Sequence, residues 1–192
     1  DEDGNLNSGI IAPNSILLLN NLTKGQTMKI NSQVNISSLD KNIPSKVSLI
    51  INENASNIKI YDAFLVNSTI TLNNTSNVLI TGNLFNSSNS TILNMVGGEC
   101  NSFINNEVYI NATSVSGIIL NNTLSSTVKG NDFEVNALAV KIIINEASAN
   151  SLIDKNVMNA KADDLIFIYS ENSNHDSIIN NNLAGVAESI YG

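Results

Sequence analysis

Residues 128–133 read Val128-Lys-Gly-Asn131-Asp-Phe133, and this arrangement of an aliphatic residue, two variable residues, an asparagine, one variable residue and an apolar residue recurs along the chain. An internal repeat of this kind predicts a stacked architecture. Its clear copies begin at Ile80, Val128, Ile153 and Ile179, and degenerate copies begin at Ile60 and Ile104. The regular recurrence of the motif indicates a stack of short coils.

A second series consists of short aliphatic runs, such as Ile118-Ile119-Leu120. The last residues of five runs follow one another at a single constant interval: Leu72, Val96, Leu120, Ile144 and Ile168. Leu19 and Ile51 end earlier runs of the same kind. Short aliphatic runs at a constant period predict one buried β-strand per coil.

Asparagine or glycine follows most of these runs, and both residues adopt the left-handed αL conformation at low cost. One column of predicted bend residues is Asn73, Gly97, Asn121 and Asn145, and the motif asparagines Asn83, Asn131, Asn156 and Asn182 form another. A further column is Asn67, Asn86, Asn111, Asn136, Asn159 and Gly185. Three strands and three bends per coil predict a triangular cross-section. We expect the stacked asparagines to hydrogen-bond from coil to coil as an amide ladder.

The sequence therefore predicts an all-β fold, a single-stranded parallel β-helix (solenoid) of about 24 residues per coil with three short strands in each. A leucine-rich repeat lacks its motif here, and β-branched residues and asparagine disfavour a helical solenoid. The dense Ile, Leu and Val runs disfavour a disordered, low-complexity tract. We expect residues 48–192 to be regular, 10–47 to be irregular first coils or a cap, and 1–9 to be a polar segment or linker.

The Ile-x-x-Asn-x-Phe coils resemble the right-handed parallel β-helix repeats of the pectate-lyase-like superfamily. The resemblance covers residues 45–192 well and residues 10–45 loosely. The background rich in Asn, Ser and Thr and free of Arg resembles the adhesin-like surface proteins of methanogenic archaea. The first resemblance implies a right-handed coil. The second implies a structural or adhesive role at a cell surface, although unrelated functions share this fold.

The net charge of the chain indicates which classes of binding partner to expect. Lysine is the only basic residue apart from one histidine, and 17 acidic residues against nine lysines give a net charge of -8. Nucleic-acid binding needs clustered Lys and Arg, so no nucleic acid is expected. No stretch approaches the roughly 18 apolar residues of a membrane span, so we expect no membrane insertion. Cys100 is the single cysteine and forms no intrachain disulfide.

No catalytic set emerges from the sequence, so we expect no enzyme, no cofactor and no metal. Pectate lyases and polygalacturonases use Asp clusters with Arg, Lys or His, and this chain has no arginine and one histidine. Asp163 and Asp164 precede a strand and are interpreted as solvating its start. His175 lies in a polar loop without a second metal ligand, and Cys100 is interpreted as a core or bend residue. Phe85, Tyr109 and Phe133 fall on the apolar column and are expected in the core.

Sequons for N-glycosylation are frequent. Those of the form Asn-x-Ser/Thr begin at Asn21, Asn35, Asn54, Asn67, Asn73, Asn74, Asn86, Asn89, Asn111 and Asn121. Many such sequons arise by chance in a chain this rich in Asn, Ser and Thr. If the protein is exported, Asp1 follows a removed leader, or the chain is part of a longer protein.

Two functions remain open at this point. The leading hypothesis is an extracellular or cell-surface structural or adhesive module, whose partners are cell-surface glycans or proteins, or further copies that assemble end to end into a filament. The alternative is a carbohydrate-binding or carbohydrate-active protein that uses one long face of the β-helix. Aromatic and acidic side chains that converge on one exposed face would favour the alternative.

Overall fold

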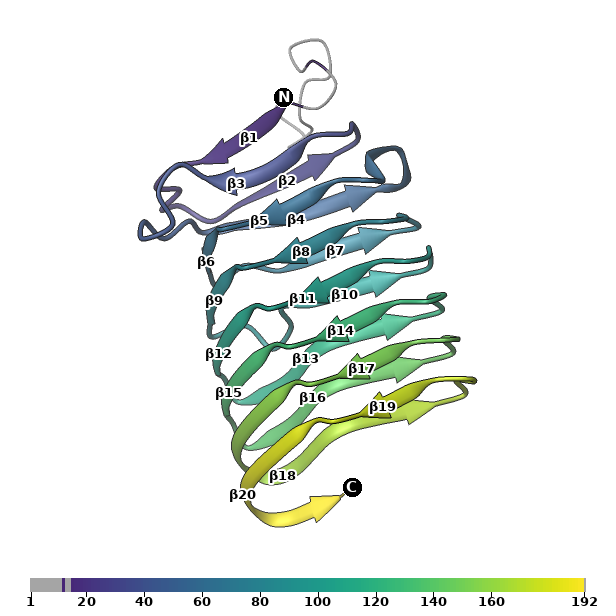
Figure 1. Ribbon diagram of the computed structural model, residues 1–192. Helices are drawn as coiled ribbons and strands as arrows, with labels where there is room; N and C mark the ends of the chain where they lie inside the picture. The colour runs from purple at the N-terminus through teal and green to yellow at the C-terminus, as the bar shows by residue number, and fades with distance from the viewer. Residues whose placement is uncertain (1–11, 13–14, 192) are drawn as a thin grey trace.

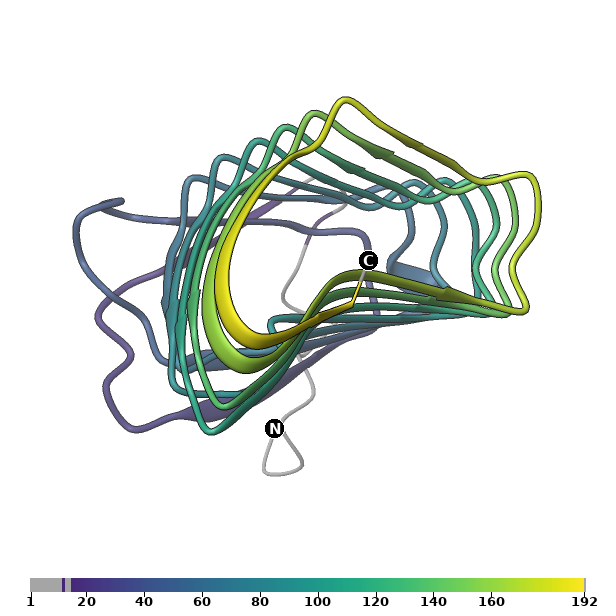
Figure 2. The ribbon, with the colours of Figure 1, turned by 90° about the horizontal axis from the view of Figure 1, so that it is seen from below.

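The computed structural model describes Ala12 and residues 15–191, with the side chains of 189–191 excepted. These residues form a parallel β-solenoid of about six coils, with about 25 residues in each (Figure 1). Seen from the C-terminal end, the chain winds anticlockwise toward the viewer, which is a right-handed coil (Figure 2). The only helix within the described residues is the short 3-10 helix η1 (Glu53–Ala55). The predicted all-β solenoid is confirmed.

One face of the solenoid is an eight-stranded parallel sheet, the β8 column. Its strands, in spatial order, are β1 (Ile16–Leu19), β3 (Asn35–Ser38), β5 (Lys59–Tyr61), β8 (Leu79–Thr81), β11 (Ser102–Ile104), β14 (Thr127–Lys129), β17 (Leu152–Asp154) and β19 (Ser177–Ile179). Neighbouring strands come from successive coils, so the pairing is parallel without any crossover helix.

The remaining strands form two more columns that join into one 12-stranded sheet. The β7 column contains β2 (Gln26–Ile30), β4 (Val47–Asn52), β7 (Ile70–Asn73), β10 (Leu93–Val96), β13 (Ser114–Asn121), β16 (Ala139–Glu146) and the second part of β18 (Val157–Glu171). The β9 column contains β6 (Phe64–Val66), β9 (Leu84–Ser87), β12 (Glu107–Asn111), β15 (Asp132–Asn136), the first part of β18, and β20 (Asn182–Tyr191), whose end continues into the β7 column. The two columns join because β18 runs through both without a break.

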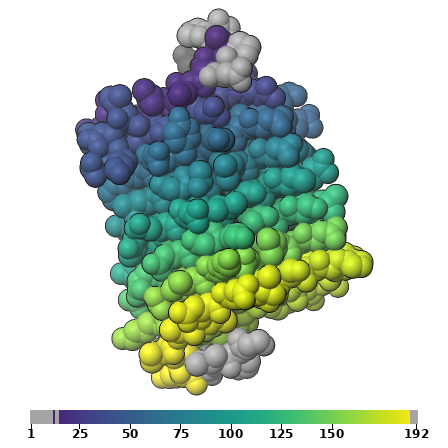
Figure 3. All heavy atoms as spheres, viewed as in Figure 1, coloured from purple at the N-terminus to yellow at the C-terminus, as the bar shows by residue number. Residues whose placement is uncertain are grey.

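The core is a set of stacked apolar columns. The β8 column contributes Ile60, Ile80, Phe103, Val128 and Ile153, and the β9 column contributes Leu65, Phe85, Val108, Phe133 and Met158. All ten side chains are buried. The rings of Phe85 and Phe103 are tilted against each other with centroids 5.7 Å apart, which is a favourable aromatic geometry. Successive coils therefore bury the same face, and the atoms pack as continuous tilted bands (Figure 3).

Coil length is not constant, and from β5 onward the change is confined to one corner. This corner connects a core residue of the β9 column to the next core residue of the β7 column. The two residues are separated by five sequence positions in the coil of Leu65 and Ile70 and by eight in the coil of Phe85 and Leu93. The separation is ten positions in the coil of Val108 and Ile118. The same separation of ten recurs in the next two coils. We call this the variable corner. By contrast, Ile80 and Phe85, and their equivalents in each later coil, are always five residues apart.

The evenly spaced aliphatic series is therefore not a single structural column. Met95, not Val96, pairs with Leu72 and Leu120, and Val96 is 38 % exposed on the outer face. Asn145, not Ile144, pairs with Leu120. The coil from Leu72 to Met95 is shorter than the coil from Met95 to Leu120, so a constant period drifts by one residue at Val96. In a strand a shift of one residue moves a side chain to the opposite face.

The predicted first coils, residues 10–47, join the same stack over their described part. β1 pairs with β3, and β2 pairs with β4, both in parallel. The connection after β3 is irregular, because Ser45 forms an isolated bridge to Leu65 in place of a strand. The connection from β4 to β5, which contains η1, is one residue longer than the next connection of its kind, from Ile70 to Ile80. The polar segment predicted at residues 1–9 lies outside the described residues.

Candidate functional site

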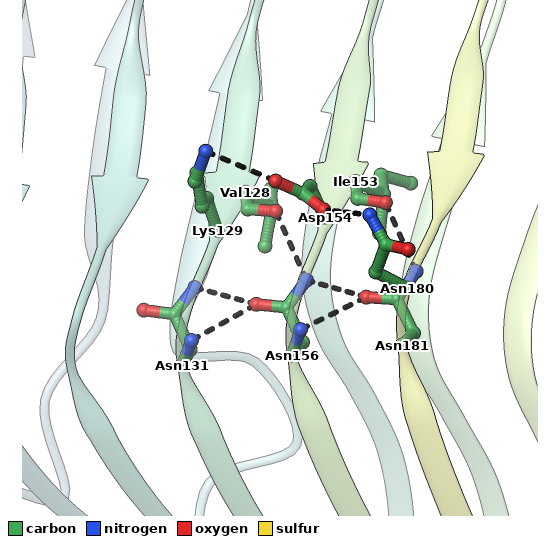
Figure 4. Close-up of polar contacts among 8 residues, drawn as sticks. All are labelled: Val128, Lys129, Asn131, Ile153, Asp154, Asn156, Asn180 and Asn181. Atoms are coloured by element: carbon green, nitrogen blue, oxygen red, sulfur yellow. Dashed lines mark hydrogen bonds and ion pairs between the residues drawn. The ribbon is translucent and has the colours of Figure 1, made fainter.

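An amide ladder occupies the corner between the β8 and β9 columns, which we call the ladder corner. Its members are Asn83, Asn106, Asn131, Asn156 and Asn181. Each of the first four donates its side-chain Nδ2 to Oδ1 of the next member, at 2.9 to 3.1 Å. The backbone N–H of the same residue donates to that same oxygen. Three consecutive members are shown in Figure 4.

The ladder also satisfies carbonyl groups beside the core. Nδ2 of Asn131 donates to the carbonyl of Phe103 at 2.9 Å, and Nδ2 of Asn156 donates to the carbonyl of Val128 at 3.0 Å. Asn181 does the same for Ile153 (Figure 4). A buried polar group without a partner is costly, so each asparagine removes several such penalties at once. The predicted amide ladder is confirmed, but its last member is Asn181 rather than Asn182, and Asn106 was missed.

Some of the predicted bend residues lie directly beside the true bends, whereas others lie within strands and have no αL residue next to them, among them Asn86, Asn111, Asn136, Asn159 and Gly185. Of all the predicted bend residues only Asn67 and Gly97 have a positive φ, of 47° and 65°. At the ladder corner the residue before each ladder asparagine takes the αL conformation; these residues are Gly82, Asn105, Gly130, Lys155 and Asn180. Asp62, before Ala63, takes the same conformation one coil earlier. The opposite corner has two αL columns, one of Asn74, Gly97, Asn122, Ala147 and Asn172 and one of Asn57, Asn77, Cys100, Ser125, Asn150 and His175. Asn73, Asn121 and Asn145 precede these bends, and the assignment of αL geometry to them was wrong.

Asn145 instead points into the solenoid and is fully buried. Its Nδ2 donates to a carboxylate oxygen of Asp176 at 2.7 Å, and its Oδ1 accepts from the hydroxyl of Ser151. Asp176 also accepts from the backbone N–H of Ser151 at 2.7 Å. This position of the β7 column, which is aliphatic at Leu72 and Leu120, is thus polar at Asn145. Asn145, Ser151 and Asp176 hydrogen-bond to one another, and these bonds offset the cost of burying their polar groups.

A charged cluster flanks the ladder on the outer face. The ammonium of Lys129 lies 3.0 Å from the carboxylate of Asp154, and Nδ2 of Asn180 donates to the same carboxylate at 3.0 Å (Figure 4). The hydrogen bond from Asn180, followed by the one from Lys129, lowers the pKa of Asp154 below its ordinary value. A carboxylate held ionised by two donors is a poor general acid or base at neutral pH, so the cluster supports coil-to-coil cohesion.

The β7 column carries a second charged group on its outer face. The ammonium of Lys141 lies 4.0 Å from the ring centroid of Tyr169, a cation–π geometry. The hydroxyl of Tyr169 donates to Glu171 at 2.5 Å. This hydrogen bond raises the pKa of Tyr169. The group links β16 to β18.

The variable corner forms a groove of about 820 Å³ that crosses four coils. Alanines at positions 112, 137, 162 and 187, one in each of these coils, are less exposed than the residues on either side and form its floor. One rim consists of Asn111, Asn136, Lys161 and Val186, and the other of Thr113, Leu138, Asp163 and Glu188. The groove exists because ten-residue corners bulge beyond the flat sheets, and a column of small side chains leaves space between the rims.

Next to this groove, the outer face of the β9 column carries Tyr109, which is 45 % exposed. Tyr109 lies beside Asn86 and Glu134 in the neighbouring coils. The expectation that Tyr109 belongs to the core was wrong, because Val108 occupies the inward position, whereas Phe85 and Phe133 are buried as expected. One aromatic ring and several Asn and acidic side chains therefore share an exposed face.

The remaining residues considered for chemistry stay apart. Asp163 and Asp164 are both exposed on β18, and Asp163 lies on the groove rim. Cys100 and His175 are exposed bend residues of the same αL column, three coils apart along it. Within the described residues no group of three or more His, Cys, Asp or Glu side chains could hold a metal ion.

The sequon asparagines are all at least partly exposed. Asn21, Asn54, Asn74, Asn86, Asn111 and Asn121 are exposed, and Asn35, Asn67, Asn73 and Asn89 are half-buried. Several hydroxyls of these sequons are occupied: Thr123 bonds to Ser148 in the interior, and Ser88 bonds to Asn67. Asn111 and Thr113, in contrast, are both exposed on the groove rims. Modification of any sequon stays a prediction.

Comparisons with known proteins add no family. No protein-family model matches the chain, and neither a curated protein sequence nor a solved structure matches it. No helix in the described part of the chain is long and apolar enough to cross a membrane. The class of protein that the fold defines is the parallel β-solenoid.

Proposed function

We propose that this chain is a non-catalytic structural module of an extracellular or cell-surface protein, acting as a rigid spacer or as an adhesive segment. The observation that carries the proposal is the amide ladder that runs without interruption from Asn83 to Asn181. A solenoid is held together by contacts between neighbouring coils. A continuous hydrogen-bonded column that ties each coil to the next stiffens such a stack along its axis.

Surface chemistry supports the same role. The outer faces carry mostly Asn, Ser, Thr and scattered acidic residues, which hydrate the stack and give the chain its net charge of -8. The exposed sequons are compatible with an exported protein. The resemblance to adhesin-like surface proteins rich in Asn, Ser and Thr favours this role over a cytoplasmic one.

Immunogold electron microscopy of the source cells, with an antibody raised against the purified chain, tests the location. Label on the cell envelope or on extracellular material is expected. Label confined to the cell interior would refute the proposal. The antibody is first absorbed with the purified chain as a control for specificity.

A second candidate function is carbohydrate binding, and the specific observation that favours it is the groove beside Tyr109. Asn and Thr on the rims supply donors and acceptors for sugar hydroxyls, and an exposed aromatic ring offers a stacking surface. A linear glycan lying along the solenoid axis would meet an equivalent alanine in each coil. The resemblance to pectate-lyase-like repeats is consistent with the use of one long face.

A glycan array probed with the labelled chain tests this second function. Binding that is lost in Tyr109→Ala and kept in Tyr61→Ala, a partly exposed tyrosine on the β8 column, would assign the glycan to the groove side. Absence of binding to all linear glycans, or equal loss in both variants, would reject the groove as a glycan site.

A further inference from the structure

The outer face of the β9 column carries an open hollow of about 210 Å³. Side chains from three consecutive coils form its walls: Asn86 of β9, Tyr109 and Asn111 of β12, and Glu134 and Asn136 of β15. These side chains share one face because every second residue of β12 and β15 is buried. Pockets for drug-sized ligands measure about 300–1,000 Å³, so this smaller hollow suits a single ring.

Tyr109 supplies an accessible aromatic surface in this hollow. Its side chain is 45 % exposed, and its hydroxyl forms no hydrogen bond with any of the described residues. Tyr169 differs, because the ammonium of Lys141 lies over its ring and its hydroxyl donates to Glu171. The protein itself thus occupies the ring and hydroxyl of Tyr169, whereas those of Tyr109 are free to meet a ligand. An exposed ring with a polar tip suits a sugar, whose C–H groups pack on the ring while its hydroxyls hydrogen-bond around it.

Polar side chains lie on both sides of this ring. Asn86 and Glu134 are the direct strand partners of Tyr109 in the neighbouring coils, and all three are exposed. Asn111 and Asn136 are exposed partners of each other two residues further along the strands. None of these four polar side chains hydrogen-bonds to another described residue. A carboxylate accepts hydrogen bonds from hydroxyls, and each amide offers both donors and an acceptor, so together they can orient one sugar ring.

The charge of this face determines which sugars fit. Glu107 and Asp132 are strand partners on the same outer face as Glu134. All three carboxylates are exposed, and none of them forms an ion pair with a described residue. Among the described strands of the β9 column the only basic residue is Lys161, in the coil after Asp132. Like charges repel, so this face disfavours a polyuronate, whereas a neutral glycan meets no such penalty.

We propose that this hollow is a subsite for one neutral sugar residue of a linear glycan, which stacks on Tyr109 and donates a hydroxyl to Glu134. The inference rests on the second candidate function, carbohydrate binding, and deepens it by naming the substrate class. Asn111 and Asn136 also line the groove of the variable corner, so the subsite is continuous with that groove. The next sugar residues of the same glycan lie in the groove.

A glycan array that pairs neutral linear glycans with uronate counterparts of the same linkage and length tests the substrate class. The whole chain should bind at least one neutral glycan more tightly than its uronate counterpart. In calorimetry with that neutral glycan, Tyr109→Ala and Glu134→Gln should each weaken binding about tenfold, since each removes a direct contact with the sugar. Tyr61→Ala on the β8 column and Glu99→Gln at the opposite corner should bind as the unmodified chain does. Circular dichroism of each variant verifies the fold.

The charge of the face gives a second readout. The double variant Glu107→Gln with Asp132→Asn should keep its affinity for the neutral glycan and gain affinity for the uronate counterpart. Equal or tighter binding of the uronate by the unmodified chain, an unchanged preference in the double variant, or full affinity for the neutral glycan in Tyr109→Ala or Glu134→Gln would overturn the inference and leave carbohydrate binding standing. Absence of binding to every glycan would reject the inference and the carbohydrate function together.

Discussion

The side chain and the backbone of Asn131 donate to one and the same oxygen, Oδ1 of Asn156, at 2.9 and 3.0 Å. Because both donors belong to a single residue, the acceptor fixes the position of Asn131 along the axis and its rotation about the chain. The same pair of bonds recurs from coil to coil along the ladder. The ladder therefore sets the register of the stack, and the apolar columns supply most of its cohesion.

Asn131→Asp tests the ladder with almost no change in side-chain shape. The substitution replaces the Nδ2 donor with an oxygen that faces the carbonyl of Phe103 and Oδ1 of Asn156. We expect a loss of roughly 3 kcal/mol or more in the free energy of unfolding, because acceptors are left unpaired and a charge is buried. Urea denaturation measures it. Asn86→Asp, at an exposed position of the β9 column, should stay within about 0.5 kcal/mol of the unmodified chain.

Adjacent residues of β13 test the inward and outward assignment. Leu120 is fully buried, while Ile119 is partly exposed on the outer face. Leu120→Asp should unfold the central coils, since an unpaired buried carboxylate costs several kcal/mol. Ile119→Asp should lower the melting temperature only slightly. Equal effects of the two substitutions on thermal unfolding would show that the register is incorrect.

Insertions distinguish the two corners. Gly-Ser added after Asn89 would lengthen the eight-residue variable corner to the length found in the next coil, at an expected cost of less than about 1 kcal/mol. Gly-Ser added after Gly130 would displace Asn131 from the ladder, where the spacing between Val128-type and Phe133-type positions is the same in every coil from Ile60 onward. We expect calorimetry to show a large drop in melting temperature only for the second insertion. A tolerated second insertion would argue against the ladder as the element that sets the register.

Asp154 gives the chain a defined acid sensitivity. Its pKa in the folded state lies below the ordinary value of 3.8, so the ionised carboxylate stabilises the fold at pH values above 3.8. This contribution is lost as pH falls through the folded pKa, because protonation removes the partner of Asn180 and Lys129. Asp154→Asn should therefore reduce stability near neutral pH, and the difference from the unmodified chain should shrink as the pH falls through the lowered pKa of Asp154. A difference that is constant from neutral pH to pH 2 would contradict this assignment.

Much of the architecture could be read from the sequence, because the motif around Asn131 carries both periodicity and chemistry. The fold class, three strands per coil and the ladder followed from the recurrence of Ile-x-x-Asn-x-apolar. The register could not be predicted in this way, because the coil lengthens at the variable corner. A constant period therefore selects Val96 and Ile144, which are each one residue away from the positions that pair with Leu72 and Leu120. The sequence did hold the missing signal: Phe103-Ile-Asn-Asn106-Glu-Val108 fits the motif one residue earlier than the degenerate copy at Ile104.

The groove at the variable corner could not be predicted from the sequence, for a different reason. The alanines at 112, 137, 162 and 187 recur at a constant period, but their period says nothing about depth. Depth arises only when ten-residue corners stack and exposed rims such as Leu138 stand on either side of the small residues. Likewise, the αL residues of the ladder corner lie one position before Asn83, Asn131 and Asn156, because the ladder needs the asparagine side chain directed inward and places the bend before it.

Native-state hydrogen exchange followed by NMR tests the central claim, that the chain is one continuous rigid stack tied together by the amide ladder. The account predicts that the backbone N–H groups of Asn106 and Asn131 exchange only through global unfolding, with equal free energies of opening that match the value from urea denaturation. Fast exchange at these positions, or free energies that differ between the two coils by several kcal/mol, would reveal a hinge or a mobile site within the stack and would contradict the structural function.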